Sequence, residues 1–166
     1  MQTLTKPYTA ITPATHDDIP IIIALAQRIW PVAYGNILTP GQIDNMLERI
    51  YSANNLRKEM AEGHQFWLAY DANAAVGFIS AYKNDTTVWI KKVYVDMAMQ
   101  GKGIGARLIE TAVAAFPSTE EIRLYVNRDN KPAHHFYERL GFIHIGEEPV
   151  QMGDGQFCDF VFSKKI

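Results

Sequence analysis

The spacing of apolar residues predicts three helical segments in the first part of the chain. From Asp17 to Trp30 apolar side chains recur every three or four positions, so a helix is expected with Pro20 in its first turn. Pro31 should end this helix and begin a loop. Thr39-Pro40-Gly41-Gln42 forms a capping box for a second amphipathic helix, and Ser52 caps a further helical piece reaching Gly63.

Short apolar segments bounded by turn residues predict the strands. Two hairpins are expected, one around Asp71-Ala72-Asn73 and one around Gly153-Asp154-Gly155. The expected strands cover residues 8–12, 65–70, 74–82, 89–95, 121–127, 142–152 and 157–162. No linker, repeat or low-complexity segment interrupts them. The order β-α-α-β-β-β-α-β-α-β-β therefore indicates one α/β domain over residues 1–166, with a mixed, largely antiparallel sheet flanked by helices.

A glycine-rich loop joins the predicted strand Trp89–Val95 to a predicted helix over Ala106–Phe116. It is the run Gln100-Gly101-Lys102-Gly103-Ile104-Gly105. Glycine has no Cβ, so a phosphate can approach the backbone closely. The free N–H groups and the dipole at the start of a helix attract anions. The loop therefore predicts a ligand that carries phosphate groups.

The spacing of the glycines in this loop distinguishes between three classes of phosphate ligand. The P-loop pattern is absent. Gly101-x-Gly103-x-x-Ala106 fits the dinucleotide fingerprint, but Asp96–Gln100 separate it from the strand. Only about 60 residues follow, too few for the usual further βα units. The third candidate is the pyrophosphate arm of coenzyme A.

A second segment, from Glu121 to Phe142, follows the same strand-then-helix logic. After the strand Glu121–Asn127, Asn130 suits an N-cap, Pro132 falls in the first turn and Gly141 suits the C′ position. One helix face then carries Ala133, Phe136, Tyr137 and Leu140.

Together the two segments resemble the signatures of the GCN5-related N-acetyltransferases. In that family an acyl-CoA loop Gln-x-x-Gly-x-Gly follows a strand such as the one ending Val93-Tyr94-Val95-Asp96 here. An Asn then opens a short helix that ends Phe-Tyr-x-x-x-Gly-Phe. The resemblance covers Thr86–Ile145 and implies the mixed α/β fold, acetyl-CoA as co-substrate and an amine as acceptor.

The resemblance also implies roles for particular residues. Tyr137 matches the tyrosine that protonates the leaving sulfur, a role open to a phenol that is neutral at neutral pH. Spacing alone favours a core aromatic at Tyr137, by roughly three to one for an aromatic at helical spacing. It also allows Asn130 to be only a cap and the strand residues to be ordinary core. The implied cofactor-binding residues are Val93, Tyr94, Val95, Gln100, Gly101, Lys102, Gly103, Ile104, Gly105, Ala106, Asn130 and Tyr137.

The sequence alone does not assign the general base that would deprotonate the acceptor amine. Many family members carry a Glu near the position of Lys91, where this sequence has Lys91-Lys92, and a lysine is a poor base unless strongly desolvated. His134 and His135 belong to the residue type most often used as a base, but the helical period places both toward the surface. The remaining candidates are Glu48, Tyr34 and a relayed water.

The acceptor is expected between the first two helices and the last hairpin. Trp30, Tyr34 and Ile37 form either an aromatic wall or simply a packed loop. Met152-Gly153-Asp154 with Asp159 resembles the tail of bacterial polyamine N-acetyltransferases, which implies a small amine or polyamine attracted by carboxylates. The alternatives are a protein N-terminal or lysine acetyltransferase, a CoA-binding sensor without catalysis and, more distantly, a nucleotide-dependent oxidoreductase.

Composition narrows the class of protein further. With 48% hydrophobic and 20% charged residues the chain is globular, and a net charge of −2 gives no reason to expect nucleic acid. Met1–Pro7 has no hydrophobic signal core, and Ile19–Ala26 is too short to span a bilayer. The single Cys158 suits a reducing compartment. We expect a cytoplasmic protein with no membrane association and no metal; the resemblance makes a homodimer an open option.

Overall fold

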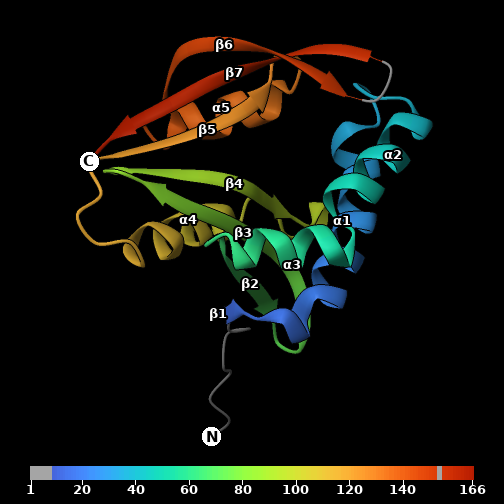
Figure 1. Ribbon diagram of the computed structural model, residues 1–166, viewed down its shortest axis with the longest axis horizontal. Coiled ribbons are helices and arrows are strands. Elements are labelled where there is room, and N and C mark those ends of the chain that lie inside the picture. The colour runs from blue at the N-terminus through green and yellow to red at the C-terminus, as the bar shows by residue number, and fades with distance from the viewer. Residues whose placement is uncertain (1–8, 153–154) are drawn as a thin grey trace, which may run out of the picture.

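The computed structural model describes residues 9–152 and 155–166. They form one sheet in the order β1-β2-β3-β4-β5-β7-β6, as expected for a mixed, largely antiparallel α/β fold (Figure 1). Only β4 and β5 are parallel neighbours. The strands are β1 (Thr9–Ala14), β2 (Gln65–Asp71), β3 (Ala74–Asn84), β4 (Thr87–Val95), β5 (Glu121–Asn127), β6 (Ile143–Met152) and β7 (Gly155–Lys165). Tyr8, Gly153 and Asp154, which were expected in a strand or turn, lie outside the described residues.

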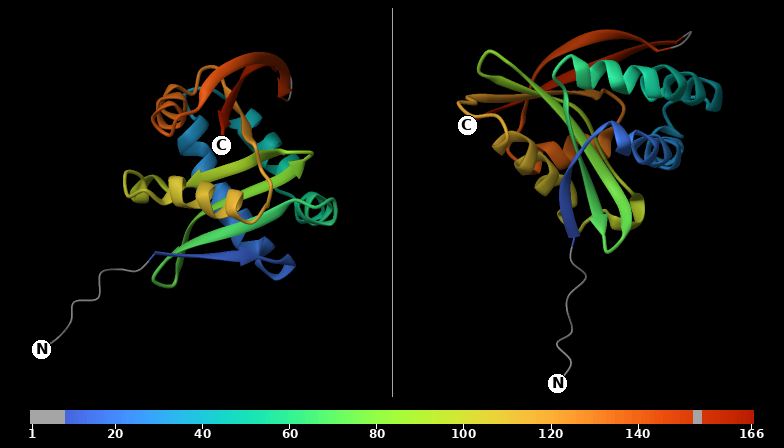
Figure 2. Two further views of the ribbon diagram at one scale, coloured as in Figure 1. Left: turned by 90° about the vertical axis from the view of Figure 1, so that its left-hand side faces the viewer. Right: turned by 60° about the horizontal axis from the view of Figure 1, so that its bottom comes forward.

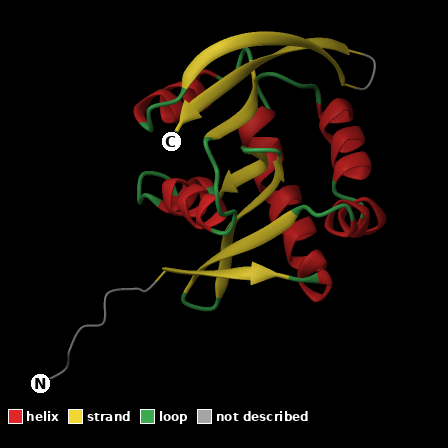
Figure 3. Cartoon of the chain, turned by 60° about the vertical axis from the view of Figure 1, so that its left-hand side comes forward, coloured by secondary structure: helices red, strands yellow, loops and turns green. Residues whose placement is uncertain are grey.

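Helices cover both faces of the sheet (Figures 2 and 3). They are α1 (Ile19–Tyr34), α2 (Pro40–Ile50), α3 (Ala53–Ala61), α4 (Ile104–Ala114) and α5 (Lys131–Arg139), with 3₁₀ turns η1 (His16–Asp18) and η2 (Met97–Met99). The first three pack on one face, where Ile22 and Leu25 meet Phe78 of β3 in a buried cluster. The last two pack on the other, where Leu108 joins a cluster with Val88. The two clusters give the sheet a core on each side.

Most of the predicted helix starts are confirmed by their caps. The Thr39 hydroxyl accepts from the backbone N–H of Gln42 at 3.2 Å, and the Gln42 side chain accepts from the N–H of Thr39 at 2.9 Å. The Ser52 hydroxyl accepts from the N–H of Asn55 at 3.1 Å. The Ser52-capped piece is thus a full helix, α3, which adds one helix to the order expected from the sequence.

The end of α1 differs from the prediction. Pro31 lies inside the helix, which continues to Tyr34, so the expected loop after Pro31 is wrong at its start. The start also differs, since the Thr15 hydroxyl, and not Asp17, provides the cap of η1 before α1. Proline costs a helix one hydrogen bond. That loss is offset by packing, because the extra turn stacks Tyr34 on Trp30 with ring centroids 4.5 Å apart.

The parallel pair in the middle of the sheet is incomplete. Thr87–Ile90 of β4 pair with Glu121–Leu124 of β5, and no pairing follows beyond that point. A register shift in the β3–β4 pairing falls at Lys91, and from there β4 stays with β3 while β5 stays with β7. Figure 1 shows the two strands spreading apart from a common end. We call the opening between residues 91–95 and residues 125–127 the strand gap.

Candidate active site

The glycine loop meets α4 in the conformation that an anion site requires. Gly101 and Gly103 have φ of 82° and 78°, the left-handed region that favours glycine. No atom of the described residues lies within 4 Å of a Cβ built at either position, so the loop is open on that side. Gly103 is the N-cap of α4, and no side chain of residues 9–152 or 155–166 caps the helix there. The first N–H groups of the helix are therefore available to an anion.

The last glycine of the loop has a different role in the packing. A Cβ on Gly105 would lie 2.9 Å from Cζ of Phe136, so this glycine lets the start of α4 approach α5. Ile104 beside it is buried in the core. Gln100 turns back to donate its side-chain N–H to the Val95 carbonyl at 3.4 Å. The loop is thus held by α5 on one side and by the end of β4 on the other.

The end of β4 presents an unpaired backbone edge to the strand gap. Val93, Tyr94 and Val95 pair with β3 on one side and have no strand partner on the other. Val93 and Val95 pack toward the α4 face, and Tyr94 packs toward the α1 face. Apart from the Val95 carbonyl, which accepts from Gln100, the N–H and C=O groups that face the gap suit an extended ligand that carries its own amides. Pantetheine, the arm of coenzyme A, is such a ligand.

Tyr137 belongs both to the core and to the strand gap. The residue is 7% exposed, and its ring meets Phe136 and Phe142 with centroids 5.1 and 5.6 Å away. Burial raises the pKa of its phenol, and the nearby Tyr34 raises the pKa further, so the group stays protonated at neutral pH. Tyr34 lies on α1, on the opposite face of the sheet, so the two phenols approach each other across the strand gap.

Three aromatic side chains form a wall on the α1 side of the gap. The hydroxyls of Tyr34 and Tyr94 are 2.8 Å apart in a hydrogen bond. Trp30 packs against both rings, with centroids 4.5 and 5.8 Å away. Burial raises the pKa of each tyrosine, which keeps both neutral. Of the three residues suggested for a wall, Trp30 and Tyr34 stack on each other, and Ile37 packs partly buried against the same cluster. Tyr94, expected to act only through its backbone, adds a third ring.

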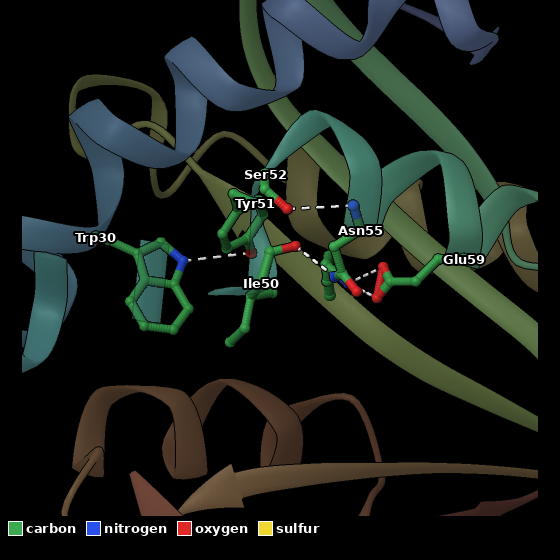
Figure 4. Close-up of polar contacts among 7 residues, drawn as sticks. Trp30, Ile50, Tyr51, Ser52, Asn55 and Glu59 are labelled. Atoms are coloured by element: carbon green, nitrogen blue, oxygen red, sulfur yellow. Dashed lines mark hydrogen bonds and ion pairs between the residues drawn. The ribbon is translucent and has the colours of Figure 1, made fainter. Parts of the chain in front are cut away.

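A polar network supports this wall from behind. Trp30 donates its indole N–H to the Tyr51 hydroxyl at 3.3 Å, and Asn55 of α3 bonds the Ile50 carbonyl nearby (Figure 4). Beside them Lys92 of β4 forms a buried ion pair with Glu59 of α3. Burial lowers the pKa of Lys92, while Glu59 opposes that change. The lysine is thus committed to a structural ion pair.

One candidate base lies in a different place from that expected. His134 is buried, which contradicts the prediction that it faces the surface, whereas His135 is exposed as predicted. The His134 ring stacks on Phe160 of β7 with centroids 5.2 Å apart, and its Nε2 bonds the Asn127 carbonyl at 3.0 Å. The helical period predicted exposure because it takes no account of β7, which covers that side of α5 and buries His134. Glu48 is exposed on α2.

Carboxylates gather on the far side of the gap. Asp159 of β7 pairs in register with Asn127 of β5 and with Glu148 of β6. Directly paired residues of antiparallel strands project from the same face, so these three side chains are neighbours. Burial raises the pKa of Asp159, and the charge of Glu148 raises it further. Sequence reasoning found Asp159 but missed Asn127 and Glu148, which only strand register brings to it. Asp154 lies outside the described residues.

Some features are absent from the described part of the chain. Within residues 9–152 and 155–166, no three His, Cys, Asp or Glu side chains are grouped as a metal site would need. No helix there has the length and apolar character to cross a membrane. Cys158 is half-buried on β7 and has no disulfide partner.

A parted sheet beside a glycine-capped helix, with a buried phenol in the gap, is the arrangement of an acyl-group transferase. Residues 25–142 match the sequence profile of the acetyltransferase (GNAT) family. Because the match covers most of the chain, this protein belongs to that family and is an acetyltransferase, as its sequence motifs indicated.

Several characterised proteins are similar to this chain. A spermidine N(1)-acetyltransferase of Thermoplasma acidophilum is 26% identical over 156 residues, covering 90% of this chain and 92% of the relative. The human N-acetylaspartate synthetase is 34% identical, but over only 51% of this chain and 29% of its own length. The crystal structure of the PaiA N-acetyltransferase from T. acidophilum in complex with coenzyme A superposes with a TM-score of 0.82 at 24% identity, over 96% of this chain and 99% of that one. At that identity the superposition establishes the shared fold.

Proposed function

We propose that this protein transfers an acetyl group from acetyl-CoA to the primary amine of a small cationic acceptor, with polyamines as the first candidates. The observation that carries the proposal is the strand gap, which has the glycine loop at one end and the Tyr34–Tyr94 wall and Asp159 on the acceptor face. A donor and an acceptor can then meet from the two faces of the sheet.

The donor side of the gap fits coenzyme A in two respects. The unpaired edge of Val93, Tyr94 and Val95 offers backbone groups to the amides of the pantetheine arm. The N–H groups of the loop from Gln100 to Ala106 offer a site for the pyrophosphate. Asn130 caps α5 by accepting from the Ala133 N–H at 3.4 Å, which leaves its amide N–H groups able to donate to the arm. The likeness to a fold crystallised with coenzyme A supports this assignment.

Tyr137 supplies the proton that the departing sulfur needs. Acetyl-CoA brings the acetyl group as a thioester, and its transfer leaves a thiolate. The Tyr137 phenol is protonated at neutral pH, and no described residue accepts a hydrogen bond from it. A nearly buried phenol beside the gap can therefore donate to the sulfur as the carbon–sulfur bond breaks.

The acceptor side favours a cation. Asp159 and Glu148 place two carboxylates side by side, and they interact with the phenols of Tyr34 and Tyr125, a setting that attracts ammonium groups. A substrate with two separated positive charges would use both features. The full-length likeness to a spermidine acetyltransferase supports a polyamine over a neutral amine.

Release of free thiol from acetyl-CoA across a panel of amines tests the proposal. The panel contains spermidine, a monoamine of similar length, a lysine-containing peptide and a peptide with a free N-terminus. Spermidine should be the best substrate. Acetylation of the peptides alone would refute the small-amine claim and leave the acetyltransferase claim standing. Binding of CoA without thiol release for any acceptor would indicate a sensor module instead.

A further inference from the structure

We propose that Asp159 is the general base of this enzyme, the carboxylate that holds the acceptor ammonium and takes its proton. This inference rests on the proposed function, because it concerns the same acceptor site. The sequence left the general base unassigned among several candidates. The carboxylate at the edge of the strand gap is the group proposed for that role.

The register of the sheet puts Asp159 at the edge of the strand gap. It pairs with Asn127, the last residue of β5, at the point where β4 has already left its neighbour. Tyr34 faces it from α1, close enough for the carboxylate charge to act on the pKa of the phenol. An amine that approaches the gap along the Tyr34–Tyr94 wall would therefore meet this carboxylate.

The Asp159 carboxylate lacks the partners that two buried carboxylates elsewhere in the described residues have. Glu59 and Glu121 are both almost fully buried, and both are ion-paired. The Asp159 carboxylate has no hydrogen bond or ion pair among the described residues, and the like charge of Glu148 stands directly opposite it. Like charges paired across strands destabilise a sheet. An arriving ammonium would supply the missing positive charge.

Asn127 provides a second, independent sign of a ligand. It is 7% exposed, and its buried Nδ2 makes no hydrogen bond to any residue that the structure describes. It projects from the same face as Asp159, since the two are paired in register. Buried donors without an acceptor are rare in folded proteins. A polar group of the bound substrates would satisfy this amide beside the ammonium that Asp159 holds.

Among the described residues, the titratable groups that interact with Asp159 include Glu148 from β6, Tyr34 from α1, Tyr125 from β5 and the neighbouring Cys158, and none of these is a cation. Burial and the charge of Glu148 raise the pKa of the carboxyl group. A carboxylate with a raised pKa is a better base, because its affinity for a proton lies closer to that of the group it must deprotonate.

Two residues, Asp159 and Tyr137, carry the protons that move during the transfer. The ammonium must lose two protons to become an amide. Asp159 accepts the first, which frees the nitrogen lone pair to attack the acetyl carbon, and later releases it to solvent. As the carbon–sulfur bond breaks, the sulfur takes the Tyr137 proton. The second proton from nitrogen restores the Tyr137 phenol, so both residues return to their starting states.

Three variants test the assignment through the pH profile of kcat with spermidine. Asp159→Asn keeps the shape of the side chain and should lower kcat by at least about 10²-fold, the low end for general base catalysis. The acidic limb of the profile should disappear with it, and Asp159→Glu should restore part of both. Glu148→Gln should keep the limb and move it to lower pH, because the charge that raises the pKa of Asp159 is removed. Glu110→Gln, on the exposed surface of α4, is the charge control.

A weakly basic amine that is already neutral at the assay pH provides the sharpest comparison. This amine needs no base for a first deprotonation. Asp159→Asn should therefore lower kcat for this amine much less than it lowers kcat for spermidine. An unchanged acidic limb in Asp159→Asn, or a rise in KM alone, would overturn the assignment. Calorimetric CoA binding and a cooperative thermal transition show that each variant is folded. A wild-type protein that acetylates no amine would instead refute the proposed function.

Discussion

Two charged clusters on the same face of the sheet have opposite surroundings. Lys92 and Glu59 are 4% and 7% exposed, and each neutralises the other beneath α3. Asp159 and Glu148 carry the same sign, and no cation of the described residues is ion-paired with either. The first cluster lies where β4 is still covered by helices, and the second lies beyond the strand gap. The buried ion pair stabilises the fold from within the chain, whereas the general-base proposal has the partly exposed carboxylates take their positive partner from the substrate.

The aromatic wall joins the two clusters. Tyr51 accepts a hydrogen bond from Trp30 and has the Lys92 ammonium 5.7 Å from its ring centroid. Tyr34, on the other side of Trp30, faces Asp159. The paired cluster therefore supports the wall against which the acceptor would lie. The difference between the clusters can be tested by perturbing each in turn.

The largest effect is expected from breaking the paired cluster. Lys92→Met leaves the Glu59 carboxylate buried without a partner, which should cost about 3–5 kcal/mol of unfolding free energy. Adding Glu59→Met removes the stranded charge and should restore most of that loss, because two apolar side chains can replace a buried ion pair. Urea unfolding of the two single variants and the double variant measures this. A double variant no more stable than Lys92→Met would contradict the structural role of the pair.

Tyr137→Phe tests the strand gap itself. The substitution keeps the ring that packs on Phe142 and removes the transferable proton, so kcat should fall about 10²-fold while the acceptor KM changes little. Steady-state kinetics with spermidine measures both constants. A loss of less than about threefold, too small for general acid catalysis, would assign Tyr137 to the core alone.

Gly103→Asp tests the anion site that opens α4. Asn and Asp are the residues that best tolerate the left-handed conformation of Gly103, so Gly103→Asn is a matched control for shape. The added negative charge at the helix start should weaken CoA binding by about tenfold relative to the Asn variant, the equivalent of about 1.4 kcal/mol. Calorimetry on both folded variants measures it. Equal affinities would place the pyrophosphate elsewhere.

Salt should reduce the preference for a doubly charged acceptor. An ammonium held by partly exposed carboxylates is screened by ions, so the advantage of spermidine over a monoamine of similar length should shrink severalfold between low and high salt. Initial rates at matched substrate concentrations measure the ratio. A ratio that does not depend on salt would indicate that shape, rather than charge, selects the acceptor.

The smallest effect is expected on the unfolding free energy of the protein when the unpaired carboxylate of Asp159 is removed. The folded-state pKa of Asp159 is raised, so the folded protein binds more protons than the unfolded chain, and stability falls as pH rises above the unfolded value. Asp159→Asn should remove that fall and stabilise the protein at neutral pH. Solvent screening keeps the gain below about 1 kcal/mol. Urea unfolding at acidic and neutral pH measures it, and a destabilised Asn variant would mean that the carboxylate supports the fold.

Local patterns in the sequence predicted the elements that depend on neighbouring residues. The strand Glu121–Asn127 has the predicted bounds, and Asn130, Ser52 and Thr39 cap the helices that follow them. Caps, turns and glycine conformations are decided within a few residues, so their chemistry is visible along the chain. The same rules failed at Pro31, where long-range packing of the next turn outweighed a lost hydrogen bond.

The sequence by itself determined the family, the glycine loop and Tyr137 as the candidate acid, because these depend on motifs of short range. Tertiary structure alone decided where β4 parts from β5, that Tyr94 turns its hydroxyl to Tyr34, and that Asn127 and Glu148 flank Asp159. These contacts join residues far apart in the chain. Strand register and the packing of helices on two faces set them, and a one-residue change of register would reverse the face of every side chain in the strand.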